Sequence, residues 1–289
     1  MANKSEYKNI FLQGFMGVGL VGYLIIESIA VSYKDQIKVI NTYPEFFPRI
    51  VTIEEGNLTP QKITISLLEI DDKKLYLLYG PQPEEETMMY FTTQTIIKDI
   101  EKIHKQNPID LYLAFGAFMN DFKIPTVERE EEAEKKAEEV INNEYINPRI
   151  IRYAKADFDP EHIIKNAPEN ISLEQSEDGV ITGLNGFMPT LVNQKLGIPS
   201  LAVMVETSII RAIQGVQDPL STYFGLTAAK AGILFLNKVM NLSISLEHVD
   251  NFINKVKNNA KEELTILINH ATIEARHSQK RNIDTSQYV

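Results

Sequence analysis

The chain contains no cysteine and no tryptophan. Without cysteine it has no disulfide bond, no thiol nucleophile, no iron–sulfur cluster and no zinc site built on thiolates. Basic residues are also few, since 29 Lys and Arg stand against 39 Asp and Glu in 289 residues, which gives a net charge of −10. A dedicated nucleic-acid-binding protein normally carries a basic face, so we expect no nucleic-acid partner.

The apolar stretch at residues 10–26 is too short for a membrane helix. It contains Gln13 and four glycines and is followed by Glu27, and it falls short of the roughly 20 apolar residues that span a bilayer. Lys4 and Lys8 precede it, as basic residues precede the apolar core of a secretion signal. The glycines favour a buried strand followed by a buried helix, so we expect a soluble, cytoplasmic protein with no membrane partner.

The sequence also lacks the common catalytic signatures. It has no G-x-S-x-G nucleophile elbow, no G-x-x-x-x-G-K-[ST] phosphate loop and no H-E-x-x-H zinc motif. Its histidines are scattered along the chain: His104, His162, His248, His270 and His277. We therefore expect no catalytic residue, no cofactor and no metal site, and interpret the protein as a non-enzyme.

What the chain does have is a regular alternation of strand and helix patterns. Strands are predicted at residues 9–15, 37–43, 49–53, 62–70, 74–79, 109–115, 148–154, 171–173 and 199–205. Helices are predicted at residues 17–31, 85–106 and 219–240, and a further helix follows Gly186 and ends at residue 196. Asp71-Asp72 is expected to turn a hairpin, and Asp218-Pro219 to cap a helix. This alternation predicts one α/β domain over residues 1–245 with a partly parallel sheet.

A strongly acidic segment interrupts this domain at about residues 126–146. Residues 128–139 hold seven Glu against three basic residues, a local charge of −4. Its apolar stripe is thin: Ala133, Ala137, Val140 and Ile141. We predict a solvent-exposed helical insertion, and the alternative is an acidic surface that faces a partner.

The end of the chain combines a periodic helix with a polar tail. Apolar residues recur at heptad-like spacing at Ile253, Val256, Ala260, Leu264, Leu267 and Ala271. This spacing predicts a C-terminal helix over residues 246–276, whose stripe packs either on its own body or, as a coiled-coil interface, on neighbouring copies. Residues 277–289 are polar and lack periodicity, which predicts a flexible tail.

Two glycine-rich segments invite a nucleotide-binding interpretation. Gly17, Gly19 and Gly22 fit the spacing G-x-G-x-x-G, but a dinucleotide site also needs an acidic residue at the end of the second strand. Glu45 is the candidate, and it lies between a proline and two phenylalanines. Close packing of a strand on a helix is the favoured use of these glycines. In the second segment, Asp178, Thr182 and Asn185 either bind an anion or ribose or form a helix cap.

Together these segments resemble known motifs. Residues 11–22, FLQGFMGVGLVG, resemble the N-terminal signature of the proteasome assembly chaperone 2 superfamily, and residues 179–186, GVITGLNG, resemble its central motif. The resemblance covers about residues 8–255. Its glycines are Gly14, Gly17, Gly19, Gly22, Gly179, Gly183 and Gly186.

The resemblance implies a three-layer α/β sandwich of the purine nucleoside phosphorylase type. It also implies an archaeal, homo-oligomeric chaperone or activator-like partner of the proteasome core particle. Some members end in a hydrophobic–Tyr–any-residue motif that docks between α-subunits. Tyr288 and Val289 match its last two positions, whereas Gln287 stands where a hydrophobic residue is expected. The alternative is an enzyme of phosphorylase-like fold that binds a nucleoside or nucleotide at the glycine motifs.

Overall fold

The computed structural model describes residues 7–17, 20–43, 51–54, 57–60, 62–81, 86–120, 122–146, 149–156, 158–165, 168, 171–176, 178, 183–208 and 218–286. The strands are β1 (Asn9–Phe15), β2 (Lys38–Tyr43), β3 (Val51–Glu54), β4 (Asn57–Pro60), β5 (Ile63–Ile70), β6 (Lys73–Gly80), β7 (Leu111–Asn120), β8 (Arg149–Ala156), β9 (Ile171–Gln175) and β10 (Ser200–Ser208). The helices are α1 (Val21–Ser32), α2 (Glu86–Gln106), a 3₁₀ turn (Glu130–Glu132), α3 (Ala133–Ile146), α4 (Glu161–Ile164), α5 (Leu184–Leu196), α6 (Pro219–Met240) and α7 (Glu247–Ser286).

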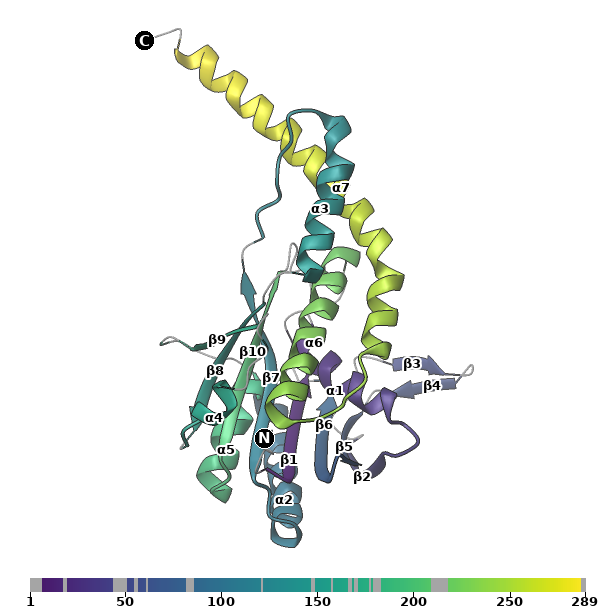
Figure 1. The fold of residues 1–289 in the computed structure, drawn as a ribbon, viewed down its shortest axis with the longest axis vertical. Coiled ribbons are helices and arrows are strands. Elements are labelled where there is room, and N and C mark those ends of the chain that lie inside the picture. Colours follow the sequence, from purple (N-terminus) through teal and green to yellow (C-terminus); the bar gives the residue numbers. More distant parts are fainter. Residues whose placement is uncertain are drawn as a thin grey trace.

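An eight-stranded sheet forms the centre of the molecule, in the order β2-β5-β6-β1-β7-β10-β8-β9 (Figure 1). The four middle strands β6, β1, β7 and β10 run parallel, whereas β5 and β8 join antiparallel on either side. In β1, every residue from Ile10 to Phe15 is buried, because helices cover both faces of a central parallel strand. The predicted α/β fold with a partly parallel sheet is confirmed.

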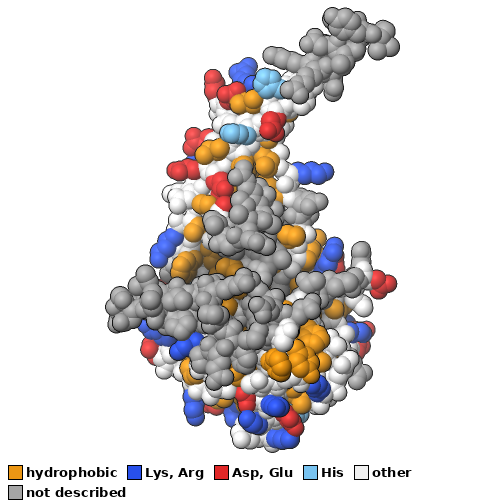
Figure 2. Space-filling model, turned by 180° about the vertical axis from the view of Figure 1, so that it is seen from behind, with side chains coloured by type: hydrophobic (Ala, Val, Ile, Leu, Met, Phe, Trp, Pro, Cys, Tyr) orange, Lys and Arg blue, Asp and Glu red, His pale blue; other side chains and the backbone are white. Residues whose placement is uncertain are grey.

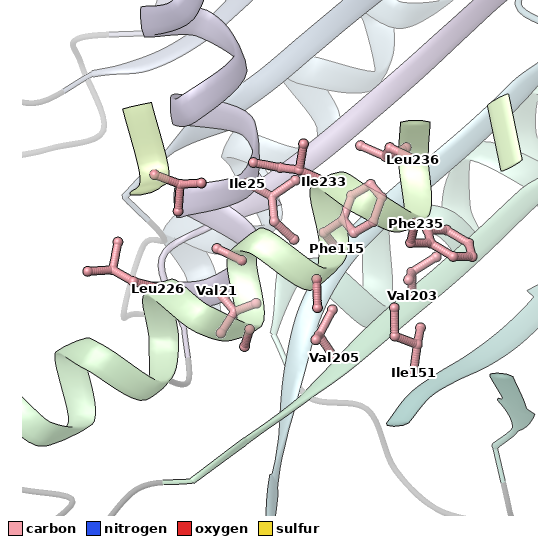
Figure 3. Packing of buried hydrophobic residues seen from close by; sticks show 14 of the residues in the cluster. Val21, Ile25, Phe115, Ile151, Val203, Val205, Leu226, Ile233, Phe235 and Leu236 are labelled. Carbon is pink, nitrogen blue, oxygen red and sulfur yellow. The ribbon is translucent and has the colours of Figure 1, made fainter. Parts of the chain in front are cut away.

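Helices form a layer on each face of this sheet. Helices α1, α6 and α7 share one apolar cluster with the sheet, and α2 and α5 share the other. Figure 3 shows Val21 and Ile25 of α1 and Ile233 of α6 beside Phe115 and Val205 of the sheet. The predicted three-layer arrangement with a long C-terminal helix is therefore present. Among the described residues, no helix is both long and apolar enough to cross a membrane.

The hairpin and the helix cap predicted from local sequence are confirmed. Strands β5 and β6 pair antiparallel around Asp71 and Asp72, whose φ angles are 53° and 63°, as a two-residue hairpin turn requires. At the start of α6, Asp218 Oδ1 accepts a hydrogen bond of 2.6 Å from the backbone N–H of Ser221. The predicted strand at 49–53 is present as β3, but it pairs with β4 in a separate two-stranded sheet.

The predicted C-terminal ends of one strand and one helix are wrong. Strand β7 does not stop before Gly116 but continues to Asn120, because it stays paired with the long strand β10. Helix α7 does not end at Arg276 but continues through Ser286, so the tail predicted for residues 277–289 is helical over most of its length. Residues 277–286 contain neither proline nor glycine, and nothing in them breaks the helix.

Candidate functional sites: the glycine-motif junction and the C-terminal arm

The two glycine-rich segments meet near the carboxyl end of β1, where the start of α5 lies against it. Gln13 of β1 donates hydrogen bonds from Nε2 to the Leu184 carbonyl at 3.0 Å and to Asn185 Oδ1 at 3.1 Å. Asn185 Oδ1 also accepts from the backbone N–H of Phe15 at 3.3 Å. The Tyr112 hydroxyl of β7 donates to Gln13 Oε1. Gln13, Tyr112 and Asn185 are all buried, so this junction joins β1, β7 and α5 through satisfied polar groups.

The glycines of the first motif lie where backbone segments nearly touch. A Cβ atom on Gly14 would lie 1.9 Å from the Gly22 carbonyl oxygen, and one on Gly22 would lie 2.2 Å from the Phe115 carbonyl oxygen. Only glycine leaves room for α1 to sit this close to β1 and β7. The structure thus places protein backbone, rather than open space, beside Gly14 and Gly22, which supports the packing interpretation over a phosphate cradle.

The remaining candidate residues of the two glycine-rich segments lie at the start of α5, beside Asn185 and at the surface. Gly183 precedes α5 with a φ of 73°, which favours glycine, and Gly186 lies in the first turn. Gly17 lies near Asn185, since a Cβ on Gly17 would be 3.9 Å from its Nδ2. Asp178 is exposed, whereas Asn185 is buried against Gln13. The residues Gly19, Glu45, Gly179 and Thr182 lie outside the described residues.

His104 lies on α2, whereas His248, His270 and His277 lie on α7. His104 Nδ1 accepts a hydrogen bond of 2.9 Å from the Ile109 backbone N–H just after α2. The His248 ring packs edge-on against Phe252, and His270 and His277 are exposed on α7. Over the part of the chain that the structure describes, no three His, Asp or Glu residues are arranged to hold a metal ion. The His162 side chain lies outside the described part.

The second candidate site is an arm formed by α7 and α3, which rises from the body of the molecule (Figure 1). In α3, Ala133, Ala137 and Ile141 are buried and belong to the same apolar cluster as α7. The segment predicted as a solvent-exposed acidic helix is helical with exposed glutamates, and its thin apolar stripe packs against α7. The signal in the sequence was the four-residue spacing of these three apolar residues, which marks one buried stripe of a helix.

Polar contacts join the two helices of the arm. Lys261 pairs with Glu134 at 3.0 Å, and Lys257 donates to Asn142 Oδ1 at 2.9 Å. The hydrogen bond with the Glu134 carboxylate raises the pKa of the Lys261 ammonium group. Further out, Arg276 pairs with Glu130 at 3.4 Å. The acidic segment thus lies along the middle of α7, from Lys257 to Arg276.

The inner half of α7 is fixed to the body. Lys230 of α6 pairs with Asp250 at 2.7 Å. Glu263 Oε2 accepts a hydrogen bond of 3.0 Å from the Leu220 backbone N–H at the start of α6, where a carboxylate is favoured by the helix dipole.

The periodic stripe of α7 faces this chain. Ile253, Ala260 and Leu264 of the predicted stripe are buried, as is Ile268, in the cluster that α7 shares with α6 and α3. Of the two alternatives, packing on its own body or on neighbouring copies, the structure shows the first for these residues. Gln287, Tyr288 and Val289 lie outside the described residues, directly after the last turn of α7.

A model of the PAC2 family matches residues 11–264 of this chain. The match includes both glycine-rich segments and the inner half of α7. Among curated protein sequences, none matches significantly.

Solved structures share the fold along nearly the whole chain. PbaB of Pyrococcus furiosus, described as an archaeal proteasome activator, is 16% identical with a TM-score of 0.62, covering 89% of this chain and 93% of PbaB. PbaA of the same organism, an archaeal homologue of proteasome-assembly chaperone, is 18% identical with a TM-score of 0.56, covering 97% and 95%. The Mycobacterium tuberculosis chaperone homologue Rv2125 is 13% identical with a TM-score of 0.55, covering 88% and 94%.

Proposed function

The chain belongs to the PAC2 family, and we propose that it is a non-enzymatic partner of the proteasome, acting as an assembly chaperone or activator-like protein. In this proposal it is an archaeal, cytoplasmic homo-oligomer that docks on the α-ring of the core particle through Gln287, Tyr288 and Val289. The fold shared with PbaA, an archaeal homologue of proteasome-assembly chaperone, and with PbaB, an archaeal proteasome activator, supports the general role.

The observation that carries the docking mechanism is the supported arm. Helix α7 has 40 residues, which is about 60 Å at 1.5 Å per residue. It is joined to α6 by Lys230–Asp250 near its start and to α3 by Lys261–Glu134 nearer its middle. A helix held from Asp250 to Arg276 directs the end of the chain away from the body, as docking on a partner requires.

The chemistry of the last three residues suits insertion between subunits. The terminal carboxylate pairs with a basic side chain, while the Tyr288 ring packs against apolar surface. Gln287 supplies no apolar contact, so one tail binds weakly. Several tails presented by one homo-oligomer raise the apparent affinity by about 10²–10⁴-fold through effective concentration.

A pull-down of archaeal core particles tests this mechanism. Full-length protein should recover core particles, and a chain ending at Ser286 should not. Gln287→Leu restores the apolar residue and should increase recovery. Equal recovery by the full-length and shortened chains would overturn docking through the tail.

The nucleotide-binding alternative has its own test. A thermal-shift screen with nucleosides, nucleotides and phosphate should leave the melting temperature unchanged. A ligand that raises it, with the rise lost in a variant at the glycine-motif junction, would support that alternative instead.

A further inference from the structure

Helices α2 and α5 carry exposed aromatic side chains on the face of the sheet opposite α7. Tyr90 and Phe91 of α2 are 56% and 55% exposed, and Phe187 of α5 is 44% exposed. The rings of Tyr90 and Phe91 contact each other edge to face, with their centroids 5.9 Å apart. Single exposed apolar residues are common, but aromatic side chains are enriched where proteins bind other proteins. This group is therefore a candidate contact surface.

The exposed side of α2 is distinct from the side that packs on the sheet. Ile96 and Ile100 are buried in the apolar cluster that α2 shares with α5 and the strands. Phe91, Gln94 and Lys98 follow one another in steps of three and four, which keeps them together on another side of the helix. Figure 2, which looks at the molecule from the side of α2 and α5, shows a compact group of hydrophobic side chains on the body with basic side chains close to it.

Two exposed lysines accompany the aromatic side chains. Within the described part of the chain, the other two lysines of α2 each pair with a carboxylate of that helix, whereas Lys98 pairs with none. Lys195 of α5 donates a hydrogen bond of 2.7 Å to Gln94 Oε1 of α2, which is a neutral amide. Helix α5 contains neither Asp nor Glu. The surface thus presents two positive charges without a carboxylate partner, in a chain whose net charge is −10.

The two helices present these residues in the same order. Helix α2 ends shortly before β7, α5 ends shortly before β10, and β7 and β10 are parallel neighbours, so the two helices run in the same direction. In each helix the aromatic residues lie in the first two turns, and the lysine follows about 10–12 Å further along, at 1.5 Å per residue. A partner that lies along both helices meets aromatic rings at one end and ammonium groups at the other.

We propose that this aromatic–lysine surface, formed by Tyr90, Phe91, Lys98, Phe187 and Lys195, binds an extended acidic segment of a partner protein. An apolar side chain of the segment packs on the rings, and its carboxylates pair with the two lysines, to which they are complementary in charge. An extended chain advances about 3.3 Å per residue, so the carboxylates lie three or four residues from the apolar side chain. The surface goes beyond the proposed function, because it needs neither the C-terminal tail nor an oligomer.

The first test uses a defined peptide, Ser-Phe-Ser-Ser-Glu-Glu-Ser, titrated into the full-length chain by isothermal titration calorimetry. The peptide should bind, although the net charge of −10 repels it from the chain as a whole. Phe91→Ala should raise the dissociation constant at least about 5-fold, as loss of an aromatic contact does in a protein interface. Val31→Ala is the matched control, an exposed apolar residue of α1 on the opposite face of the sheet, and should leave it unchanged.

The second test examines the charges and their spacing. Lys98→Glu and Lys195→Glu should each raise the dissociation constant by about 2- to 30-fold, because an attraction becomes a repulsion. Lys34→Glu, at an exposed position just after α1, changes the net charge equally and should have no effect. The peptide Ser-Ser-Ser-Phe-Glu-Glu-Ser has the same composition, but its glutamates directly follow the phenylalanine. It should bind more weakly, because it cannot reach the rings and the lysines together.

Three results would overturn the proposal: no binding of the first peptide, equal binding of both peptides, or equal effects of Lys34→Glu and Lys98→Glu. A single-stranded oligo(dT) that binds in place of the peptide, and is lost in Phe91→Ala, would instead assign the surface to nucleic acid. A change in the sedimentation of Phe91→Ala without peptide would assign it to contact between copies, and this result too would overturn the proposal. None of these measurements involves core particles, so their outcome is independent of tail docking.

Discussion

The amide of Gln13 donates a hydrogen bond to Asn185, 172 residues further along the chain. The bond joins the two glycine-rich segments, and Asn185 Oδ1 accepts at the same time from the backbone of Phe15. Because these groups are buried together, one amide side chain satisfies donors from two positions of the central strand. These buried hydrogen bonds thus hold the two glycine-rich segments together.

Asn185→Ala should destabilise the protein by about 1–3 kcal/mol, because the Gln13 amide and the Phe15 N–H lose a buried partner. Urea unfolding followed by circular dichroism measures the change. Gln194→Ala, at an exposed position of the same helix, should stay within about 0.5 kcal/mol of wild type. An Asn185→Ala variant as stable as this control would contradict a stabilising role for these hydrogen bonds.

Gly22→Ala should be strongly destabilising, by about 3 kcal/mol, because the new methyl group meets the Phe115 carbonyl oxygen and forces α1 off the sheet. Gly17→Ala is the matched control from the same motif, since its methyl group would have 3.9 Å of clearance. The melting temperatures of the two variants, measured by thermal unfolding, are compared with each other. Equal tolerance of both substitutions would argue against close packing as the role of Gly22.

Ala137→Asp should detach α3 from α7, because it places a charge in the buried seam between them. We expect hydrogen exchange of amides in residues 264–276 to become at least about 10-fold faster, while the central strands stay protected. Glu138→Ala, at the neighbouring exposed position, should leave exchange unchanged. Unaltered protection of α7 in Ala137→Asp would show that α3 does not support the arm.

Acid should weaken the attachment of α2 to β2. Burial alone would raise the pKa of Asp99, but hydrogen bonds from Lys102, Tyr43 and Asn41 outweigh it and lower that pKa. A carboxylate with a lowered pKa stabilises the fold above its unfolded pKa of about 3.9, and this contribution disappears as the pH falls through the folded value.

Asp99→Asn should therefore reduce the loss of stability between about pH 5 and pH 2. The urea concentration at the midpoint of unfolding, measured at a series of pH values, reports this loss of stability. Glu138→Gln, a substitution at an exposed position, is the control. A wild-type pH dependence in Asp99→Asn would rule out this carboxylate as a contributor.

Features set by local sequence were predictable from the chain alone. The Asp71–Asp72 turn and the Asp218 cap depend on a few neighbouring residues. The apolar character of β1 follows from its central place in a parallel sheet.

Long-range features were not predictable in the same way. The bond between Gln13 and Asn185 joins two ordinary amides across 172 positions. The pairing of Lys261 with Glu134 spans 127 positions, and both residue types are common on exposed helices. The periodic stripe of α7 predicted a packed helix correctly, but periodicity does not say whether the packing partner is the same chain or another.

The contact between Glu263 and Leu220 joins the middle of α7 to the body of the protein. Glu263 lies about midway along α7 and holds the first turn of α6, a helix buried in the body. Of the contacts along α7 described above, this is the one that joins the arm to the backbone at the start of α6. A displacement of α7 at Glu263 would therefore also displace the first turn of α6.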